Sequence, residues 1–307
     1  MHSPVFARRK TLYRITISAI FLSLTLVVST LTTAYLPVLG AAGIKISISG
    51  IISVFPALLF GPAYGAAVCA LVDILGHFIS PAGAYIPLLT LTAALSGFLI
   101  GLFWKRLERL RAENAEGFNR IAAIFMALLA MLGAAFSLSL HADGLCDTLW
   151  VRAESVPEKA ALTAGSYRPL TALTVSLIRY TSEKKAQAYF AAYANFLGVG
   201  LIAVGVFGLL LLVLMHAASV RHPSEKQTEI GFGSLFFAVF VPRWIVTTIN
   251  TKILQIFLTA WNGRAFWILY APRLLEEILT NIFQVYLIWV LYNVYRRRIE
   301  PSLRGKI

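Results

Sequence analysis

Residues 61–87 read GPAYGAAVCALVDILGHFISPAGAYIP, which predicts a turn, a short apolar helix and a second turn. Asp73 and His77 are four residues apart in this segment, so a helix places both on one face. Ionisable side chains within an apolar membrane segment are costly and mark functional sites by default. This helix is therefore the first candidate site, and the apolar runs around it decide the fold.

The composition is that of a polytopic helical membrane protein. Hydrophobic residues make up 58% of the chain and charged residues 13%, whereas a soluble domain carries about 25% charged residues. A net charge of +13 can indicate nucleic-acid binding, but the basic residues fall at the ends of apolar runs. Lys and Arg behave in this way in the cytoplasmic loops of membrane proteins. The sequence therefore predicts an all-α transmembrane bundle.

The apolar runs predict about eight spanning helices, because several reach the roughly 20 residues that cross a bilayer. The runs cover residues 13–34, 47–60, 63–79, 88–104, 118–140, 189–215, 232–260 and 266–295. Basic clusters precede the first run and follow the last, so the positive-inside rule predicts that both termini are cytoplasmic. We also expect a kink at Pro56 and a short extended piece around Ile44 and Ile46.

One long polar segment, residues 141–188, interrupts this pattern on the external side. Its charges are balanced, and we expect either one or two helices that lie on the surface or a loosely ordered excursion. The two cysteines, Cys69 and Cys146, do not form a metal-binding or redox pattern.

The last two apolar runs are unusually polar. Their polar residues are Arg243, Asn250, Thr251, Lys252 and Gln255 in one run, and Arg273, Glu276, Glu277, Thr280, Asn281 and Gln284 in the other. Each residue taken singly is as consistent with a structural bond between helices as with a binding role. The whole set favours a polar cavity. Lys252 has no local partner in the sequence, so a carboxylate on another helix, such as Asp73, is one expected partner.

Common catalytic motifs are absent from the sequence. It contains no G-x-x-x-x-G-K-[ST] loop, no H-E-x-x-H, no Gly-x-Ser-x-Gly and no Cys/His ligand cluster. We therefore expect no enzyme activity, no cofactor and no bound metal. A ligand-binding membrane protein without its own energy source needs an ion gradient or a partner.

Several short motifs point to one family. They are Ile46-Ser47, Phe60-Gly61-Pro62, Gly65-Ala66, Asp73, residues 81–87, Thr90-Leu91 and Gly97, followed by Asn250-Thr251, Arg273-Leu274-Leu275 and Gln284. With them, the chain resembles the substrate-binding (S) components of energy-coupling factor (ECF) vitamin transporters, and within these the folate family. Members of that family ordinarily have six helices. The resemblance thus divides the chain into residues 1–117 and 232–307, the two halves of the membrane core, and an insertion, residues 118–231, with two extra transmembrane helices and an external loop.

The resemblance implies a binding subunit of a bacterial plasma-membrane importer. In that family the S component binds a vitamin from outside at high affinity, and a transmembrane scaffold (T) component and two cytoplasmic ATPases supply the power. The implied ligand-binding residues are Lys45, Asp73, His77, Tyr85, Asn250 and Arg273. Asp73 and Asn250 would hydrogen-bond a folate-like heteroaromatic ring, Tyr85 would stack on it, and Lys45 or Arg273 would meet a carboxylate. His77 is either a ligand contact or the first polar residue at the membrane surface. Ala19 and Ser23 would form the face that docks on the T component.

Two other functions compete with this interpretation. A gradient-driven secondary transporter would use Asp73, Glu276 or Lys252 as a proton relay, and such transporters usually contain an internal repeat. No such repeat is evident in the sequence. A membrane-embedded enzyme that acts on lipid or prenyl groups would need a metal-binding or Asp-rich motif, which the sequence lacks.

Overall fold

The structure is a computed structural model that describes residues 4–32, 34–38, 41–81, 83–178, 182–221, 231–258 and 266–296. Its long helices are α1 (Pro4–Thr32), α4 (Pro62–Ile79), α5 (Pro87–Ala142), α9 (Leu201–Arg221), α10 (Phe232–Phe257) and α11 (Phe266–Val294). Within the described residues, seven helical segments are long and apolar enough to span a membrane. The predicted polytopic helical bundle is confirmed.

The second predicted span is shorter than expected. Residues 47–60 form two short helices, α2 (Gly50–Ser53) and α3 (Phe55–Phe60), which together are too short to cross a bilayer. The break falls at Val54, just before Pro56 in the first turn of α3. Proline lacks the amide hydrogen needed to continue α2. The expected disturbance at Pro56 is therefore an interruption of the helix.

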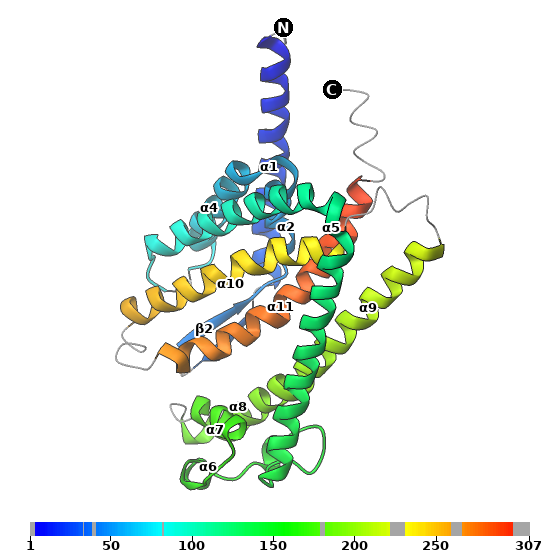
Figure 1. The fold of residues 1–307 in the computed structure, drawn as a ribbon. Helices are drawn as coiled ribbons and strands as arrows, with labels where there is room; N and C mark the ends of the chain where they lie inside the picture. The colour runs from blue at the N-terminus through cyan, green and yellow to red at the C-terminus, as the bar shows by residue number, and fades with distance from the viewer. Residues whose placement is uncertain are drawn as a thin grey trace.

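A β-hairpin follows α1. Strand β1 (Ala34–Val38) pairs antiparallel with β2 (Ala41–Ile46), with Tyr35 opposite Lys45. This confirms the extended piece expected around Ile44 and Ile46. The hairpin lies against the side of the bundle near α11 (Figure 1).

Helices α4 and α5 approach each other closely because small residues face one another. A methyl group added at Gly65 would lie 2.5 Å from the carbonyl oxygen of Gly97, and one added at Gly101 would lie 2.7 Å from the backbone nitrogen of Pro62. Only glycine allows backbones to approach so closely. The family motif that contains Gly65 and Gly97 therefore has a packing role, which holds the start of α4 beside residues 97–101 of α5.

The prediction of a loop between residues 104 and 118 is wrong. The structure has one continuous 56-residue helix, α5, where two separate spans were expected. The intervening residues are rich in Leu, Arg, Glu and Ala and contain no proline, so their helix propensity continues the helix through a polar stretch. The two apolar parts of α5 run in different directions: the first lies beside α4 and α10, and the second lies beside α9 (Figure 1).

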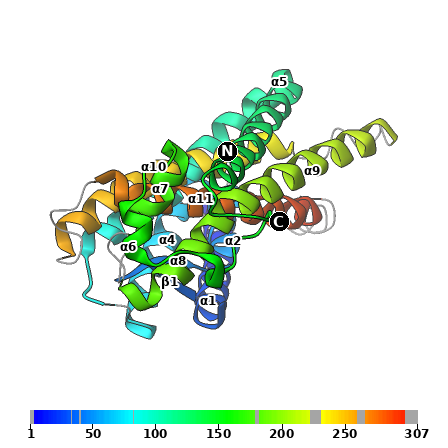
Figure 2. The same cartoon turned by 90° about the horizontal axis from the view of Figure 1, so that it is seen from below.

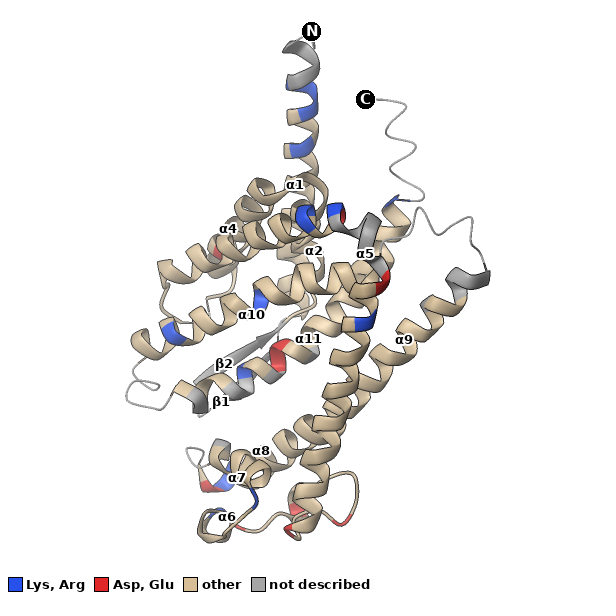
Figure 3. Cartoon of the chain, viewed as in Figure 1, with Lys and Arg blue, Asp and Glu red and all other residues tan. Residues whose placement is uncertain are grey.

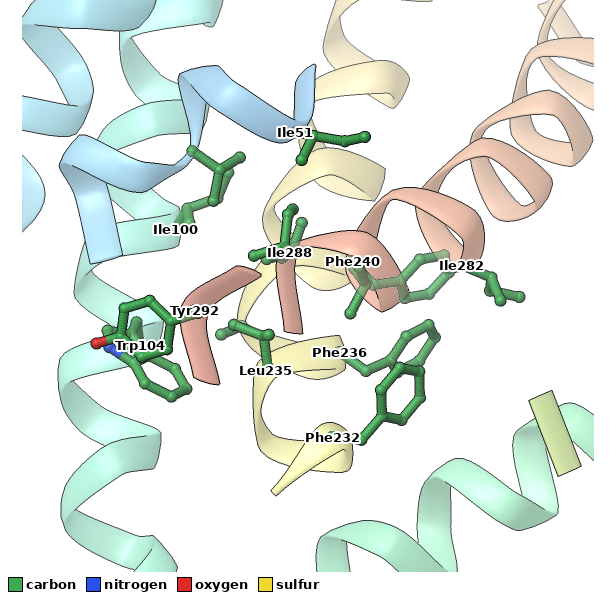
Figure 4. Close-up of a cluster of buried hydrophobic side chains, with 14 of the residues drawn as sticks. Ile51, Ile100, Trp104, Phe232, Leu235, Phe236, Phe240, Ile282, Ile288 and Tyr292 are labelled. Carbon is green, nitrogen blue, oxygen red and sulfur yellow. The ribbon is translucent and has the colours of Figure 1, made fainter. Parts of the chain in front are cut away.

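The core lies where α2, α5, α10 and α11 meet. Phe232, Phe236 and Phe240 stack in sequence along α10, and the labelled side chains of the four helices converge in Figure 4. Trp104 of α5 packs edge-on against Tyr292 of α11 with ring centroids 5.6 Å apart. This packing fixes α10 between α5 and α11.

The long polar segment is folded, and together with α8 (Glu183–Asn195) it forms what we call the cap, residues 143–178 and 182–195. The cap contains a 3₁₀ turn (Ala153–Ser155), α6 (Lys159–Ala164), α7 (Pro169–Ile178) and α8. The cap has its own buried apolar cluster, built around Leu162, Ile178 and Phe190. Of the two expectations for this segment, the structure thus supports ordered helices. In Figure 2, seen from below, cap helices α6, α7 and α8 lie toward the viewer.

Helix α8 continues into α9 through a π-helical turn, Phe196–Gly200. The corresponding membrane span therefore begins at Glu183, before the Tyr189 expected from the sequence. Glycines let α9 pack on the second part of α5, since a methyl group at Gly205 would lie 2.6 Å from the carbonyl oxygen of Met126.

The two ends of the molecule differ in charge. The first turns of α1 and the end of α11 lie at one end, and the cap lies at the other (Figure 1). Basic side chains gather on the first turns of α1 and on the middle of α5 (Figure 3), where Lys105, Arg106 and Arg109 are exposed. The cap carries both acidic and basic residues.

Candidate functional site

The first candidate group lies where the end of α4 meets the start of α5. The hydroxyl of Thr90 donates to Asp73 Oδ2 at 2.6 Å. The hydroxyl oxygens of Tyr85 and Thr90 are 2.7 Å apart. Because Thr90 gives its only proton to Asp73, Tyr85 is the donor to Thr90. The three side chains thus form a directed chain of hydrogen bonds that ends on the carboxylate.

His77 lies one helical turn after Asp73 and faces the same loop. Its ring centroid is 5.1 Å from that of Tyr85, with the two planes tilted by 48°. Tyr85 is 42% exposed, so part of its ring remains accessible. Asp73, His77 and Tyr85, all predicted from the sequence, are therefore brought together.

Asn250 joins this end of the bundle from α10. Its side-chain oxygen accepts a hydrogen bond from the Thr92 hydroxyl at 2.5 Å, and Thr92 is buried. Residues two apart on a helix point to nearly opposite sides. Thr90 and Thr92 on the first turns of α5 therefore hold Asp73 of α4 and Asn250 of α10, respectively. We use the name outer polar group for six residues: Asp73, His77, Tyr85, Thr90, Thr92 and Asn250.

Thr90 and Thr92 were not predicted as site residues. The sequence contained one signal, since Thr90 belongs to a family motif. A second signal is their spacing. Thr90 and Thr92 are two residues apart at the start of a helix, and the neighbouring helices carry a carboxylate and an amide that the two hydroxyls can bind.

A second group surrounds Arg243 of α10. Its guanidinium donates to Asn281 Oδ1 at 2.7 Å, to Gln284 Oε1, and to the carbonyl oxygen of Gly50 at 2.9 Å. Asn281 in turn donates to Glu277 Oε1 at 2.6 Å, so an amide connects the guanidinium to the carboxylate. Buried charges in a membrane need such partners.

Glu277 completes this second group. Its other oxygen accepts from Thr247 of α10 at 2.8 Å, and Asn281 and Thr247 are both buried. The polar residues of the last two helices thus bond α2, α10 and α11 together. For Arg243, Glu277, Asn281 and Gln284 the contacts support the structural interpretation.

The same group holds the base of the hairpin. Gln284 donates to the carbonyl oxygen of Ser47 at 3.0 Å, and the hydroxyl of Ser47 is 3.3 Å from that of Thr32. Thr32 ends α1 and Ser47 follows β2. Both ends of the hairpin are therefore anchored beside α11.

Three other predicted residues are Lys252, Arg273 and Lys45. Lys252 is exposed and donates to Gln255 on its own helix at 3.0 Å, while Asp73 accepts from Thr90, so the expected pair between Lys252 and Asp73 is not formed. Arg273 interacts electrostatically with Glu276 and Glu277 on its own helix. Lys45 lies in β2, and its side chain is outside the described part of the structure.

The predicted docking face lies on α1. Ala19 and Ser23 are both exposed, and the Ser23 hydroxyl donates to the carbonyl oxygen of Ala19 at 3.0 Å, within the helix. Large apolar residues on the same helix, such as Ile20 and Leu24, are also exposed. This face of α1 has small residues at its centre and is not covered by the described part of the chain.

Comparison with known proteins supports the resemblance drawn from the motifs. Residues 9–157, just under half of the chain, match a protein family described as the ECF-type riboflavin transporter, S component. The similarity to ECF S components is confirmed, and the description names riboflavin where the motifs suggested folate. Neither a curated protein nor a solved structure matches the chain.

Proposed function

We propose, from the match of residues 9–157 to the S-component family, that this chain is the vitamin-binding subunit of an ECF importer. One observation carries the proposal: α5 holds Asp73 of α4 through Thr90 and Asn250 of α10 through Thr92. Helix α4, helix α10 and the loop before α5 thereby present a carboxylate, an amide and an aromatic side chain, respectively, at one end of a membrane bundle. This chain binds and positions the vitamin and does no catalysis.

The outer polar group suits a planar heteroaromatic ligand. A carboxylate accepts several hydrogen bonds, of which Thr90 supplies one, and an amide both donates and accepts. Asp73 would pair with a donor on the ring edge, and Tyr85 would stack on its face, with His77 beside it. Asn250 lies on the opposite side of α5, so it would pair with the same ring only if the ligand lies across the first turns of α5. Because Thr90 and Thr92 already hold the two polar side chains, little conformational freedom is lost on binding.

Two vitamins fit this chemistry, a flavin and a folate. Both contain a fused ring with a pyrimidine-type edge that donates and accepts hydrogen bonds. The matched family is described by riboflavin, and the motifs between Gly61 and Gly97 resemble the folate family. Folate carries a carboxylate tail and riboflavin an uncharged one, so Lys45 and Arg273 would contribute to folate binding alone.

The proposal includes the partners and the orientation. A T component would dock on Ala19 and Ser23, which lie on an exposed face of α1, and two cytoplasmic ATPases would supply the energy. The chain would lie in a bacterial plasma membrane with both termini cytoplasmic. The exposed basic residues at the end that contains the start of α1 support this orientation.

The test is a titration of the purified chain with riboflavin and with folate, followed by tryptophan quenching. Asp73→Ala should weaken binding of the cognate vitamin roughly 10- to 100-fold, since hydrogen bonds to a charged group contribute about 1.5–3 kcal/mol. The matched control is Asp147→Ala, which removes an exposed carboxylate of the cap and should leave the affinity unchanged. Equal affinities for Asp73→Ala and the unaltered protein would overturn the assignment of Asp73.

The alternative is a gradient-driven transporter, and one observation favours it. Glu277 lies within a candidate span and is joined to Arg243 through Asn281. Ionisable groups in that position form proton relays in transporters. The two functions differ in whether the chain alone moves its ligand across a membrane.

A further inference from the structure

The loop between α5 and the 3₁₀ turn displays two large apolar side chains. Leu149 is 74% exposed and Trp150 is 59% exposed, whereas Val151, the next residue, is 3% exposed. The cap has its own apolar cluster, which includes Leu145 and Val151. Leu149 and Trp150 thus lie outside the apolar cluster of the cap, in which Leu145 and Val151 are buried.

Hydrogen bonds fix this loop in place. The Thr148 hydroxyl donates to the Trp150 carbonyl oxygen at 2.7 Å and accepts from the Trp150 amide at 3.3 Å. The side chain of Asn195 binds both backbone groups of Val151: its Oδ1 accepts from the Val151 amide at 2.7 Å, and its Nδ2 donates to the Val151 carbonyl oxygen at 2.8 Å. The exposed pair is therefore presented by an ordered turn.

The contact between Val151 and Asn195 also fixes the position of the turn relative to the candidate membrane spans. Asn195 lies within the candidate span Glu183–Leu214. Three residues further on, within the π-helical turn, a methyl group at Gly198 would lie 2.6 Å from the Ser137 hydroxyl of α5. Val151 is thus held beside Asn195, twelve residues after the start of that span, and near the end of the span Glu116–Ala142, where Leu138 is 68% exposed.

We propose that Leu149 and Trp150 insert into the headgroup–acyl boundary of the leaflet on the cap side, and so anchor the cap to lipid. Tryptophan is enriched at this boundary because its ring is largely apolar and its N–H is polar. The partner is the bilayer itself, because the turn lies level with an exposed apolar side chain of a candidate span, Leu138. The proposal does not depend on which ligand the chain binds.

Nitroxide labels can measure the depth of the turn in nanodiscs that hold one copy of the full chain. Leu149→Cys is the test site, Leu138→Cys on α5 is the lipid reference, and Glu154→Cys on the cap is the water reference. The parent protein measures the labelling background from Cys69 and Cys146. Collisions with oxygen report lipid and collisions with a soluble nickel chelate report water.

The oxygen-to-nickel collision ratio at Leu149→Cys should be several-fold higher than at Glu154→Cys and should approach that at Leu138→Cys. A ratio equal to that at Glu154→Cys would overturn the proposal. It would mean that the turn faces water in this preparation, as expected if the turn normally binds another protein and not lipid. A second measurement uses brominated lipids, which should quench the unaltered protein more than Trp150→Phe. Equal fractional quenching of the two proteins would also count against lipid insertion.

Discussion

Single hydroxyl groups organise the outer polar group. Thr90 stands between Asp73 and Tyr85, so Thr90→Val should release both side chains. Ligand binding should weaken at least about fivefold, since a hydrogen bond contributes roughly 1 kcal/mol between neutral groups and more to a carboxylate. Titration of the vitamin by tryptophan quenching measures this effect. Thr163→Val, which alters an exposed hydroxyl of the cap, is the control. Unchanged affinity in Thr90→Val would mean that Asp73 is positioned without Thr90.

Gly97 tests the close approach of α4 and α5. A methyl group added at Gly97 would overlap the carbonyl oxygen of Gly65 and lie 2.9 Å from Cys69 Sγ. Gly97→Ala should destabilise the protein by about 1–3 kcal/mol through overpacking, measured as a lower thermal midpoint in detergent. Gly76→Ala is the control, since a methyl group there meets no atom within 4 Å. Equal midpoints for the two variants would contradict this account of the helix contact.

For single residues, the sequence identifies which side chains belong to the candidate site better than it identifies their hydrogen-bond partners. The four-residue spacing of Asp73 and His77 placed both on one face, and the loop brings Tyr85 to them. The pairing of Thr92 with Asn250 joins residues 158 positions apart. That pairing depends on how α5 is rotated between α4 and α10, and the sequence pattern of α5 alone does not specify this rotation.

Arg243 joins three elements, so its removal should affect the whole bundle. Arg243→Ala would leave the Gly50 carbonyl and the side chains of Asn281 and Gln284 without their donor. Each buried group left unsatisfied costs about 1–3 kcal/mol, and the thermal midpoint should fall markedly. Arg120→Ala is the matched control, because its ion pair with Glu116 is exposed and contributes about 0–1 kcal/mol. Similar midpoints for the two variants would show that the Arg243 contacts are not structural.

The long helix α5 shows where sequence rules fail at the level of elements. A basic cluster after an apolar run predicts the end of a span correctly, yet it does not predict the end of the helix. Residues 105–117 keep helical propensity, so two spans are joined without a loop. The opposite occurs in residues 47–60, where the apolar pattern continues but the helix is interrupted at Val54, although Val54 itself keeps helical backbone angles.

The outer polar group needs both halves of the predicted core. Asp73 and Thr92 precede the proposed insertion of residues 118–231, and Asn250 follows it. The second part of α5 runs out to the cap and α9 runs back (Figure 1), so α10 begins at the end of the bundle from which the insertion departs. Two extra spans are therefore compatible with a core assembled from residues 1–117 and 232–307.

The orientation of the whole molecule can be tested in intact cells. Lys10→Cys lies among the exposed basic residues of α1, and Glu154→Cys lies on the cap. The positive-inside rule predicts that a membrane-impermeant thiol reagent labels Glu154→Cys and reaches Lys10→Cys only after the cells are opened. The reverse pattern would place both termini outside and would be incompatible with docking on a cytoplasmic ATPase complex.

The most direct test of the central claim uses the purified chain alone in proteoliposomes, with radiolabelled riboflavin and folate. We predict saturable binding of one vitamin, at no more than one molecule per chain, with the same amount bound in the presence and absence of a proton or sodium gradient. Asp73→Ala should abolish most of this binding. Accumulation of vitamin inside the vesicles in response to a gradient alone would contradict the S-component assignment and establish a secondary transporter.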